Sequence, residues 1–428
     1  MTKRPITKKY LILICLMLLS SFTFAQTRVT ELTKEEKIVG LSKIWSEVSY
    51  NFANFDLSKI DWDETYKSYI SKVLETKTTE EYYNELKKMV ALLKDSHTNV
   101  YYPDPNYAKP PLRTRLIESK LIITRVSNDA LRKQNIEVGD EIIEINKTNA
   151  LDYGRTNVMP YQGSSTLQDL NIRTYTYFLF YGNANEKIEL KIRKKNNFVF
   201  TTSISRRLKS DYEYKTYELR ITKDKVAYLK INDFENNNYK DIFDSLYVKL
   251  LPSKALIIDI RENDGGNSEQ GFYVLSHLID KNTLSAKSRT RQSISLRKAR
   301  GLGDNWLEIA PDTICPISKK IKYLKPVIVL TGAQTLSAGE DFLVAFDNSK
   351  RGIKIGQTTG GSTGQPLFFN LPGGGSFRVC TKRDAYPDGK EFVGLGIFPD
   401  IRIQETVKSI QTKHDLVLEK AIEILKKK

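Results

Sequence analysis

The stretch VIVLTGAQTLSAGE, residues 327–340, passes from an unbroken apolar run into a polar turn and the start of a helix. Such a run is typical of a strand that is buried on both faces of a sheet. Ser337 lies where the strand gives way to the helix, so its hydroxyl would reach the sheet edge beside the unpaired N–H groups of the helix N-terminus. Serine is also a preferred helix cap, and the local sequence by itself favours that role.

Two further apolar runs, 226–231 and 255–260, are each followed by a segment of helical character. This alternation predicts a layered α/β core over residues 208–428. Gly265 and Gly266 follow the second run, and paired glycines either permit a tight turn or let backbone N–H groups approach a substrate carbonyl. Residues 281–323 are rich in Lys, Arg and Ser and are predicted to form an irregular insertion over the core.

Residues 26–105 are predicted to form a helical bundle. Thr33 with Glu36, and Thr78 with Glu81, have the spacing of capping boxes, and apolar residues at helical intervals follow each pair. A proline-containing linker over 102–111 ends this segment.

A β-rich region is predicted over 106–207, with a strand at 121–126, a short helix near 130, a Gly-Asp turn at 139–140 and a strand up to 146. This order resembles a PDZ domain, which adds an extended chain end to a sheet edge. The sequence 113–116 stands where such domains have a Gly-rich carboxylate-binding loop, so binding of C-termini is left open.

The N-terminus has the pattern of a secretory signal peptide over residues 1–25, with basic residues, a short apolar run and cleavage after Ala25. Removal of its four basic residues lowers the net charge from +16 to +12. The apolar run is shorter than the ~20 residues of a spanning helix, so we expect a mature protein in the periplasm or outside the cell, without a stable membrane span.

Composition excludes several classes of protein. Three cysteines and three histidines, none clustered, argue against a disulfide framework or a metal centre, and no motif indicates a cofactor. A disulfide between Cys315 and Cys380 stays open. The basic residues are dispersed, which argues against nucleic acid as a partner. The sequence does not indicate an oligomeric state.

A serine nucleophile needs a base with a pKa near neutrality, and histidine fits best. His277 lies on an expected helix beside leucines and is interpreted as a packed residue, whereas His414 is interpreted as solvated. His97 follows Ser96 at the end of an expected helix and is the best candidate of the three.

Five segments in this order are similar to motifs of the tail-specific, or C-terminal processing, serine peptidases: LLKDSHT at 92–98, IDIRENDGG at 258–266, LSAGE at 336–340, IGQTTGG at 355–361 and GLGIFPD at 394–400. Each is modest alone, but together they reverse the local preference for a cap at Ser337. The resemblance covers nearly all of the chain after the signal peptide. It implies a crotonase-like layered β/α catalytic core, flanked by the helical bundle and the PDZ-like domain.

Many peptidases of this family use a Ser–Lys dyad, but Ser362 stands about where the lysine would be. The chain instead resembles the tricorn-like branch, which implies Ser337 as nucleophile, His97 as base and Ser96 as the group that orients the imidazole. The same resemblance implies backbone N–H groups of Ala338 and of Gly265 or Gly266 as oxyanion donors.

The acidic member of the tricorn-like site is the weakest assignment, because Val393 occupies the nearest register. Glu391 is two positions away and is the candidate, although it could equally be an exposed acid in a turn. Glu340 is expected to support the helix start, and Arg261 to pair with an acid.

The resemblance predicts an exported serine endopeptidase that acts on unfolded proteins or C-terminal peptide segments through an acyl-enzyme. We expect its activity to rise through the titration range of histidine. The alternatives are a hydrophobic-ligand-binding protein, as in the similar interphotoreceptor retinoid-binding modules, or an envelope scaffold that acts through its PDZ-like domain.

Overall fold

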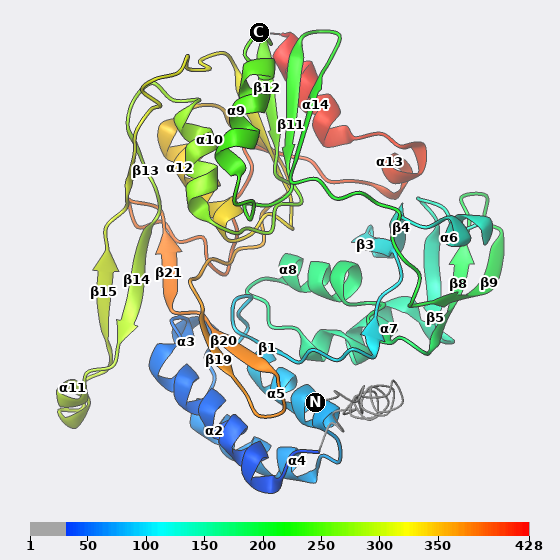
Figure 1. Cartoon of the computed structure of the whole chain (residues 1–428), viewed down its shortest axis with the longest axis vertical. Coiled ribbons are helices and arrows are strands. Elements are labelled where there is room, and N and C mark those ends of the chain that lie inside the picture. The colour runs from blue at the N-terminus through cyan, green and yellow to red at the C-terminus, as the bar shows by residue number, and fades with distance from the viewer. Residues whose placement is uncertain (1–30, 428) are drawn as a thin grey trace, which may run out of the picture.

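The computed structural model describes residues 31–427, so the predicted signal peptide at 1–25 lies outside the described residues. The chain forms three units, which can be followed in Figure 1. We call them the helical unit (α2–α5), the central β unit (β3–β9 with its helices) and the parallel-sheet unit (β10–α14).

The helical unit begins at the predicted capping box. Thr33 accepts the Glu36 N–H, and the Glu36 carboxylate accepts the Thr33 N–H, so this box is confirmed. Thr78 accepts the Glu81 N–H in the same way, but the Glu81 carboxylate accepts the Lys77 N–H instead of completing the box. The helices of this unit are α2 (Lys34–Asn51), α3 (Phe55–Ser58), α4 (Trp62–Glu75) and α5 (Thr79–Ala91).

Strands from the far end of the chain complete the helical unit. Strand β1 (Asn99–Tyr101) pairs antiparallel with β20 (Ser376–Val379), which pairs with β19 (Leu367–Asn370). Phe377 and Val379 are buried in the same core as Leu41. The segment predicted as a bundle over 26–105 therefore shares its core with residues that lie almost 300 positions later, a contact that no local periodicity encodes.

The central β unit contains an antiparallel sheet in the order β3-β4-β5-β8-β9, with β6 beside β5. The predicted succession of strand, helix, Gly-Asp turn and strand is found as β4, α6 and β5. In the turn, Asp140 accepts the Glu137 N–H and pairs with Lys194. The elements are β2 (Tyr107–Ala108), β3 (Leu112–Ile117), β4 (Lys120–Val126), α6 (Asp129–Lys133), β5 (Glu141–Ile145), β6 (Thr148–Asn149), α7 (Ala150–Asn157), η1 (Met159–Tyr161), α8 (Leu167–Ile172), η2 (Arg173–Tyr177), β7 (Gly182–Asn183), β8 (Lys187–Arg193) and β9 (Val199–Ser205).

The parallel-sheet unit contains the three strands predicted from apolar runs. The sheet order is β10-β11-β12-β17-β18-β22, and every neighbour pair except β10–β11 is parallel. Its elements are β10 (Tyr217–Ile221), β11 (Val226–Ile231), α9 (Tyr239–Leu250), β12 (Ala255–Asp259), α10 (Ser268–Ser276), β17 (Val327–Thr331), α12 (Ala338–Ser349), β18 (Ile353–Gly356), β22 (Ile401–Arg402), α13 (Val407–Thr412) and α14 (Leu416–Lys426).

Both faces of this sheet are covered, which explains the continuous apolar runs. Ile258 and Val329 pack with residues of α9, α10 and α12 on one face. Their neighbours Ile257 and Ile328 pack with α14 residues on the other face. Because parallel strands end together, the loops after β12 and β17 meet at one sheet edge.

The prediction of an irregular insertion over 281–323 is wrong in part. Strand β14 (Lys287–Gln292) pairs with β15 (Asn305–Ile309) in a hairpin that carries α11 (Ser295–Ala299) near its tip, and β14 also pairs with β21 (Lys382–Ala385). The hairpin extends from the body of the molecule (Figure 1). Most of its residues stay accessible to solvent, so its polar composition is compatible with strands. Two short strands, β13 (Thr283–Leu284) and β16 (Thr313–Ile314), close its base.

Cys315 is exposed and Cys380 is buried, and both are free, so the disulfide left open by the sequence is not formed. Within residues 31–427, no helix is both long and apolar enough to cross a bilayer.

Candidate active site

Ser337 has a backbone conformation that is unusual for a residue with a side chain. It connects β17 to α12 with φ of 56° and ψ of −124°, and its side chain makes no capping hydrogen bond. The cap favoured by the local sequence is therefore not formed. Such a conformation typically costs about 1–3 kcal/mol and persists only where the surroundings enforce it, as they often do at functional sites.

The Ser337 hydroxyl contacts His97. The distance from Ser337 Oγ to His97 Nε2 is 3.1 Å, although the two residues are 240 positions apart. His97 is only 6% exposed. Its backbone is fixed by Asp95, which accepts the His97 N–H at 2.9 Å and receives a bond from Asn54 of the helical unit at 3.0 Å.

The second nitrogen of the imidazole contacts Ser362. The distance from His97 Nδ1 to Ser362 Oγ is 2.9 Å, and the Ser362 carbonyl accepts the Ser337 N–H at 3.0 Å. Ser362 thus bonds both members of the pair. Sequence reasoning missed this contact, although Ser362 was already marked as the residue at the family's lysine position.

Glu340 holds the loop that carries Ser362. Its carboxylate accepts the N–H of Ser362 at 2.8 Å, the N–H of Gly361 at 2.9 Å and the hydroxyl of Thr359. The side chain is fully buried, and burial raises the pKa of Glu340 to about 8. The expectation that Glu340 supports only the helix start is therefore incomplete, because its carboxylate bridges α12 to the Ser362 loop.

The structure does not bring the Ser96 side chain to the imidazole. Ser96 Oγ donates to Asp169 of α8 at 2.7 Å and contacts Ser165. Arg173 pairs with the same Asp169 carboxylate and donates to the Ser96 carbonyl. The predicted orienting bond from Ser96 is replaced by the one from Ser362, and Ser96 instead ties the His97 segment to the central β unit.

Glu391 also lies apart from the pair. It forms a β-bridge with Ala385, and its carboxylate pairs with Arg289 at 3.1 Å and Arg383 at 3.5 Å. Its side chain is 40% exposed. This placement matches the alternative of an accessible acid in a turn, and the two arginines account for its charge.

Burial makes His97 hard to protonate. It lowers the pKa of His97 to about 3, and the positive charges of Arg378, Arg173 and Lys382 contribute in the same direction. The imidazole is neutral at neutral pH and can accept a proton there. Because the pKa lies below the usual range, the expectation that activity rises through the ordinary titration range of histidine no longer holds for the free protein.

The other two histidines lie where the sequence placed them. His277 is fully buried and packs edge-on against Tyr247 and Tyr273. His414 is exposed and contacts Glu419 at 2.9 Å. Across residues 31–427, no group of three or more His, Cys, Asp or Glu side chains is arranged to hold a metal ion.

Gly265 forms the wall beside the Ser337 side chain. Its φ is 115°, and a Cβ at this position would lie 2.6 Å from the Ser337 Cβ. The Gly265 N–H donates to Asn263 Oδ1 at 3.0 Å, so it is already used. Among the described residues, the N–H groups of Gly266 and Ala338 have no acceptor, which leaves these two of the predicted donors available.

The pair opens into a cleft of about 740 Å³ between the units. His97, Gly266, Leu336 and Ser337 form part of its lining, together with residues of η2 and of the base of the β14–β15 hairpin.

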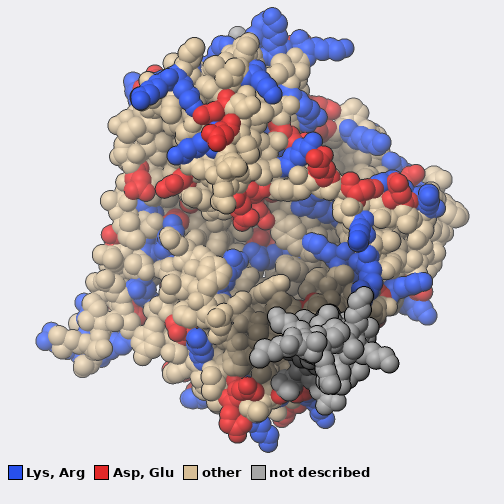
Figure 2. Space-filling view, in the orientation of Figure 1, with Lys and Arg blue, Asp and Glu red and all other residues tan. Residues whose placement is uncertain are grey.

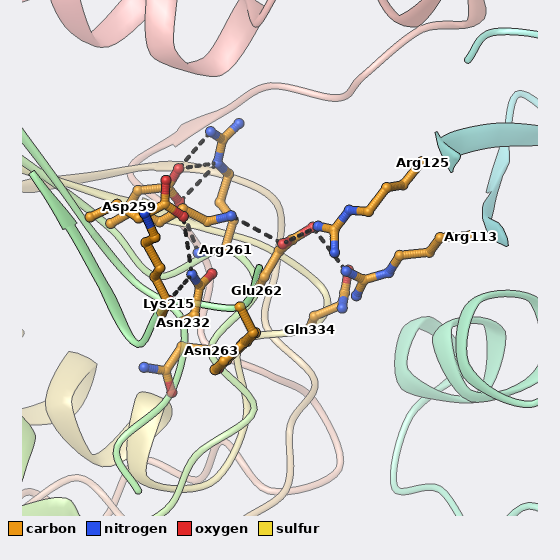
Figure 3. A network of polar contacts seen from close by, with 12 residues as sticks. Arg113, Arg125, Lys215, Asn232, Asp259, Arg261, Glu262, Asn263 and Gln334 are labelled. Carbon is orange, nitrogen blue, oxygen red and sulfur yellow. Dashed lines mark hydrogen bonds and ion pairs between the residues drawn. The ribbon is translucent and has the colours of Figure 1, made fainter. Parts of the chain in front are cut away.

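Charged side chains fix the central β unit against the parallel-sheet unit near this cleft (Figure 3). The carboxylate of Glu262, just after β12, forms ion pairs with four basic side chains: Arg115 at 2.8 Å, Lys230 at 3.1 Å, Arg125 at 3.2 Å and Arg113 at 3.4 Å. The predicted pairing of Arg261 with an acid is confirmed, since it bonds Asp259 at 2.6 Å and Asp415 at 2.7 Å.

Comparison with family models indicates a serine-type peptidase. Residues 225–403 match the sequence model of peptidase family S41, and residues 34–91 match that of the tricorn protease C1 domain. The chain thus carries a peptidase S41 domain and a tricorn protease C1 domain, and peptidases of family S41 are serine-type hydrolases.

The chain is also similar in sequence to curated C-terminal processing proteases. A carboxy-terminal-processing protease of Bartonella bacilliformis is 24% identical over 200 residues, covering 45% of this chain but only 42% of that protein. A carboxyl-terminal-processing protease of Picosynechococcus sp. is 21% identical over 390 residues, covering 87% of this chain and 84% of that protein.

Solved structures share the fold. Mature CPAF superposes with a TM-score of 0.74 at 16% identity, covering 92% of this chain and 97% of that chain. The photosystem II D1 C-terminal processing protease superposes with a TM-score of 0.52 at 17% identity, covering 87% and 94% of the two chains. The multidomain α/β architecture is thus common to this chain and these peptidases.

Proposed function

We propose that this chain is an exported serine endopeptidase that cleaves unfolded proteins or C-terminal peptide segments through an acyl-enzyme. The observation that carries the proposal is the 3.1 Å contact between Ser337 Oγ and His97 Nε2 in a water-accessible cleft. Export rests on the signal-peptide pattern of residues 1–25. The names of the curated relatives support C-terminal segments as the substrate.

In this mechanism Ser337 Oγ attacks the scissile carbonyl while its proton passes to His97 Nε2. Ser362 Oγ accepts the Nδ1–H and thereby selects the tautomer whose Nε2 is free to act as base. The N–H groups of Ala338 and Gly266 stabilise the oxyanion, and one such donor is worth about 3 kcal/mol in serine hydrolases. His97 then protonates the leaving amine, and water attacks the acyl-enzyme by the reverse sequence.

The depressed pKa of His97 is compatible with a base that is protonated only during the reaction. The buried imidazole gains its proton when negative charge develops on the adjacent oxyanion, so the two new charges appear together and stabilise each other. The nearby arginines oppose the isolated imidazolium, which favours rapid transfer of the proton to the leaving group.

We assign PDZ-like character to the central β unit and a crotonase-like arrangement to the parallel-sheet unit. The order β4, α6 and β5 and the antiparallel sheet support the first assignment. The layering of helices on both faces of the sheet supports the second. The proposed bounds are 26–105, 106–207 and 208–428, with β19 and β20 contributed to the first unit by the last.

Fluorophosphonate labelling tests the proposal. The parent should label at one serine and degrade an unfolded protein, Ser337→Ala should do neither, and His97→Ala should slow labelling by at least about a hundredfold. His414→Ala removes an exposed histidine and should behave like the parent. Labelling that persists in Ser337→Ala would contradict the assignment of the nucleophile.

A further inference from the structure

The cleft around Ser337 carries a charge opposite to that of the whole chain. The chain has a formal net charge of +16. The cleft lining nevertheless has twice as many acids as bases. The acids are Asp169, Glu235, Asp264, Glu269, Asp312 and Asp341, and the bases are Arg173, Arg378 and Lys382.

Ion pairing enlarges this imbalance. Arg173 is neutralised by Asp169 at 2.8 Å, and Lys382 by Asp384 at 2.9 Å. Arg378 faces the Ser96 carbonyl. The five remaining acids of the lining form no salt bridge within residues 31–427. After Arg378 is counted, the lining therefore has four more unpaired acids than unpaired bases.

His97 and Asp264 have neighbours of opposite charge. The groups that act electrostatically on His97 are all basic: Arg378, Arg173 and Lys382. Asp264, just before Gly265, instead has Glu235 and Asp233 as acidic neighbours, and with burial they raise its pKa. Glu269 follows in the first turn of α10. Asp264 and Glu269 thus lie on either side of the glycines that follow β12, next to the nucleophile.

Asp341 adds an unsatisfied acceptor close to the nucleophile. It lies one helical turn after Ser337 on α12, and its N–H donates to the Ser337 carbonyl. Its Oδ2 accepts from Ser268 at 2.6 Å, whereas Oδ1 has no partner among the described residues and the side chain is 9% exposed. A buried acceptor in a substrate cleft is expected to gain its donor when the cleft is filled.

We propose that the cleft selects peptide segments that carry a Lys or Arg side chain next to the scissile bond. This inference rests on the proposed peptidase function. A long cationic side chain places its charge several ångströms from the backbone, where it meets the unpaired carboxylates, and a cleft of one sign concentrates substrates of the other. On the face drawn in Figure 2, a group of acidic side chains lies near the centre, with Lys and Arg beside it and over the margins.

The test compares two peptides that are identical except for Lys or norleucine beside the cleaved bond, since norleucine keeps the aliphatic stem without the charge. Cleavage sites are mapped by mass spectrometry in a mixture of such peptides, and kcat/KM is then measured for the matched pair. We expect about a tenfold preference for the Lys peptide at low salt. It should shrink on adding salt, because exposed charges are screened over about 10 Å at 0.1 M.

Variants locate the source of the preference. The double variant Glu235→Gln, Glu269→Gln should lower the ratio of kcat/KM for the Lys peptide to that for the norleucine peptide about threefold. Asp341→Asn should lower it as well. Glu75→Gln removes one carboxylate, as Asp341→Asn does, but on α4 outside the cleft, and it should leave the preference intact. An unchanged preference in both cleft variants would overturn the inference.

Binding separates this inference from the peptidase proposal. Fluorescence anisotropy with Ser337→Ala measures recognition without cleavage. Tighter binding of the Lys peptide supports the inference even if the parent cleaves neither peptide, a result that would count against the proposed function alone. Equal binding of the two peptides overturns the inference even if the parent is an active peptidase.

Discussion

Ser362 links the two groups that would carry the reaction. Its hydroxyl bonds His97 Nδ1, and its carbonyl bonds the Ser337 N–H. The backbone of the loop is in turn held by the buried carboxylate of Glu340. A serine can orient a neutral imidazole but cannot share its positive charge as a carboxylate would, so this site stabilises the imidazolium less than a Ser-His-Asp triad does.

Replacement of Ser362 tests this role as a positioning residue. Ser362→Ala removes one hydrogen bond and should lower kcat about tenfold with little change in KM, because the imidazole loses its fixed tautomer. Thr363→Ala is the matched control, since the Thr363 hydroxyl is buried next door and has no partner in the described chain. The rate of fluorophosphonate labelling is the second readout. Equal rates in Ser362→Ala and Thr363→Ala would assign Ser362 a purely structural role.

At the scale of elements, the site depends on the close approach of the loops after β12 and β17. The Gly265 backbone lies against the Ser337 side chain, and Leu336 donates its N–H to the Asn263 carbonyl. These contacts hold the nucleophile turn in its positive-φ conformation. The glycine is required here for space as well as for its φ of 115°.

Gly265→Ala should therefore abolish labelling, because its Cβ would displace the Ser337 side chain. Gly374→Ala provides the control: its φ is 86°, yet nothing lies within 4 Å of its added Cβ. Both variants carry a backbone strain of about 1 kcal/mol or more, so the midpoint temperature of thermal unfolding should fall in both. Only Gly265→Ala should also lose activity. Labelling of Gly265→Ala at the parent rate would contradict the contact.

At the scale of the whole molecule, one carboxylate ties two units together. Glu262 of the parallel-sheet unit faces arginines of β3 and β4, and their charges hold the pKa of Glu262 well below its usual range (Figure 3). A depressed pKa means that the folded state favours the ionised form. Its contribution to stability is present above the unfolded pKa of about 4.5 and is lost as the pH falls further.

Glu262→Gln should lower the free energy of unfolding by about 3 kcal/mol at pH 7, because it leaves buried arginines without their partner. The difference from the parent should narrow below pH 4.5, where the Glu262 carboxylate of the parent takes up a proton in the unfolded state but stays ionised in the folded state. Urea unfolding between pH 3 and 7 measures both effects. Glu213→Gln breaks an exposed pair with Lys215 and should change little. A loss in Glu262→Gln no larger than in this control would remove the network as a source of stability.

The sequence predicted the buried strands and the Ser337–His97 pair, because each is recognisable from a short segment. The apolar runs of β11, β12 and β17 predicted the buried sheet, and Ser337 and His97 stood in recognisable motifs. The roles assigned to Ser96 and Glu391 depended on side-chain direction, which a linear motif does not specify. The bridge from Glu340 to the Ser362 loop depends on a carboxylate remaining buried, which its neighbours in sequence do not indicate.

The sequence also did not reveal which strands pair over long distances in the chain. The strands that close the helical unit come from residues 367–379, and their register with β1 arises only when these distant segments of the chain pair. The β14–β15 hairpin was not predicted, because solvent-facing strands lack the alternation of apolar and polar residues that marks a half-buried strand.

The proposed base and the proposed nucleophile belong to different parts of the chain. His97 is anchored through Asp95 to Asn54 of the helical unit and through Ser96 to Asp169 of the central β unit, whereas Ser337 belongs to the parallel-sheet unit. Reactive geometry tolerates errors of only about 1 Å. The rate at which Ser337 reacts with a phosphonate is thus a reporter of assembly: it registers whether the three units are docked, and would register their loosening before any spectroscopic sign of unfolding.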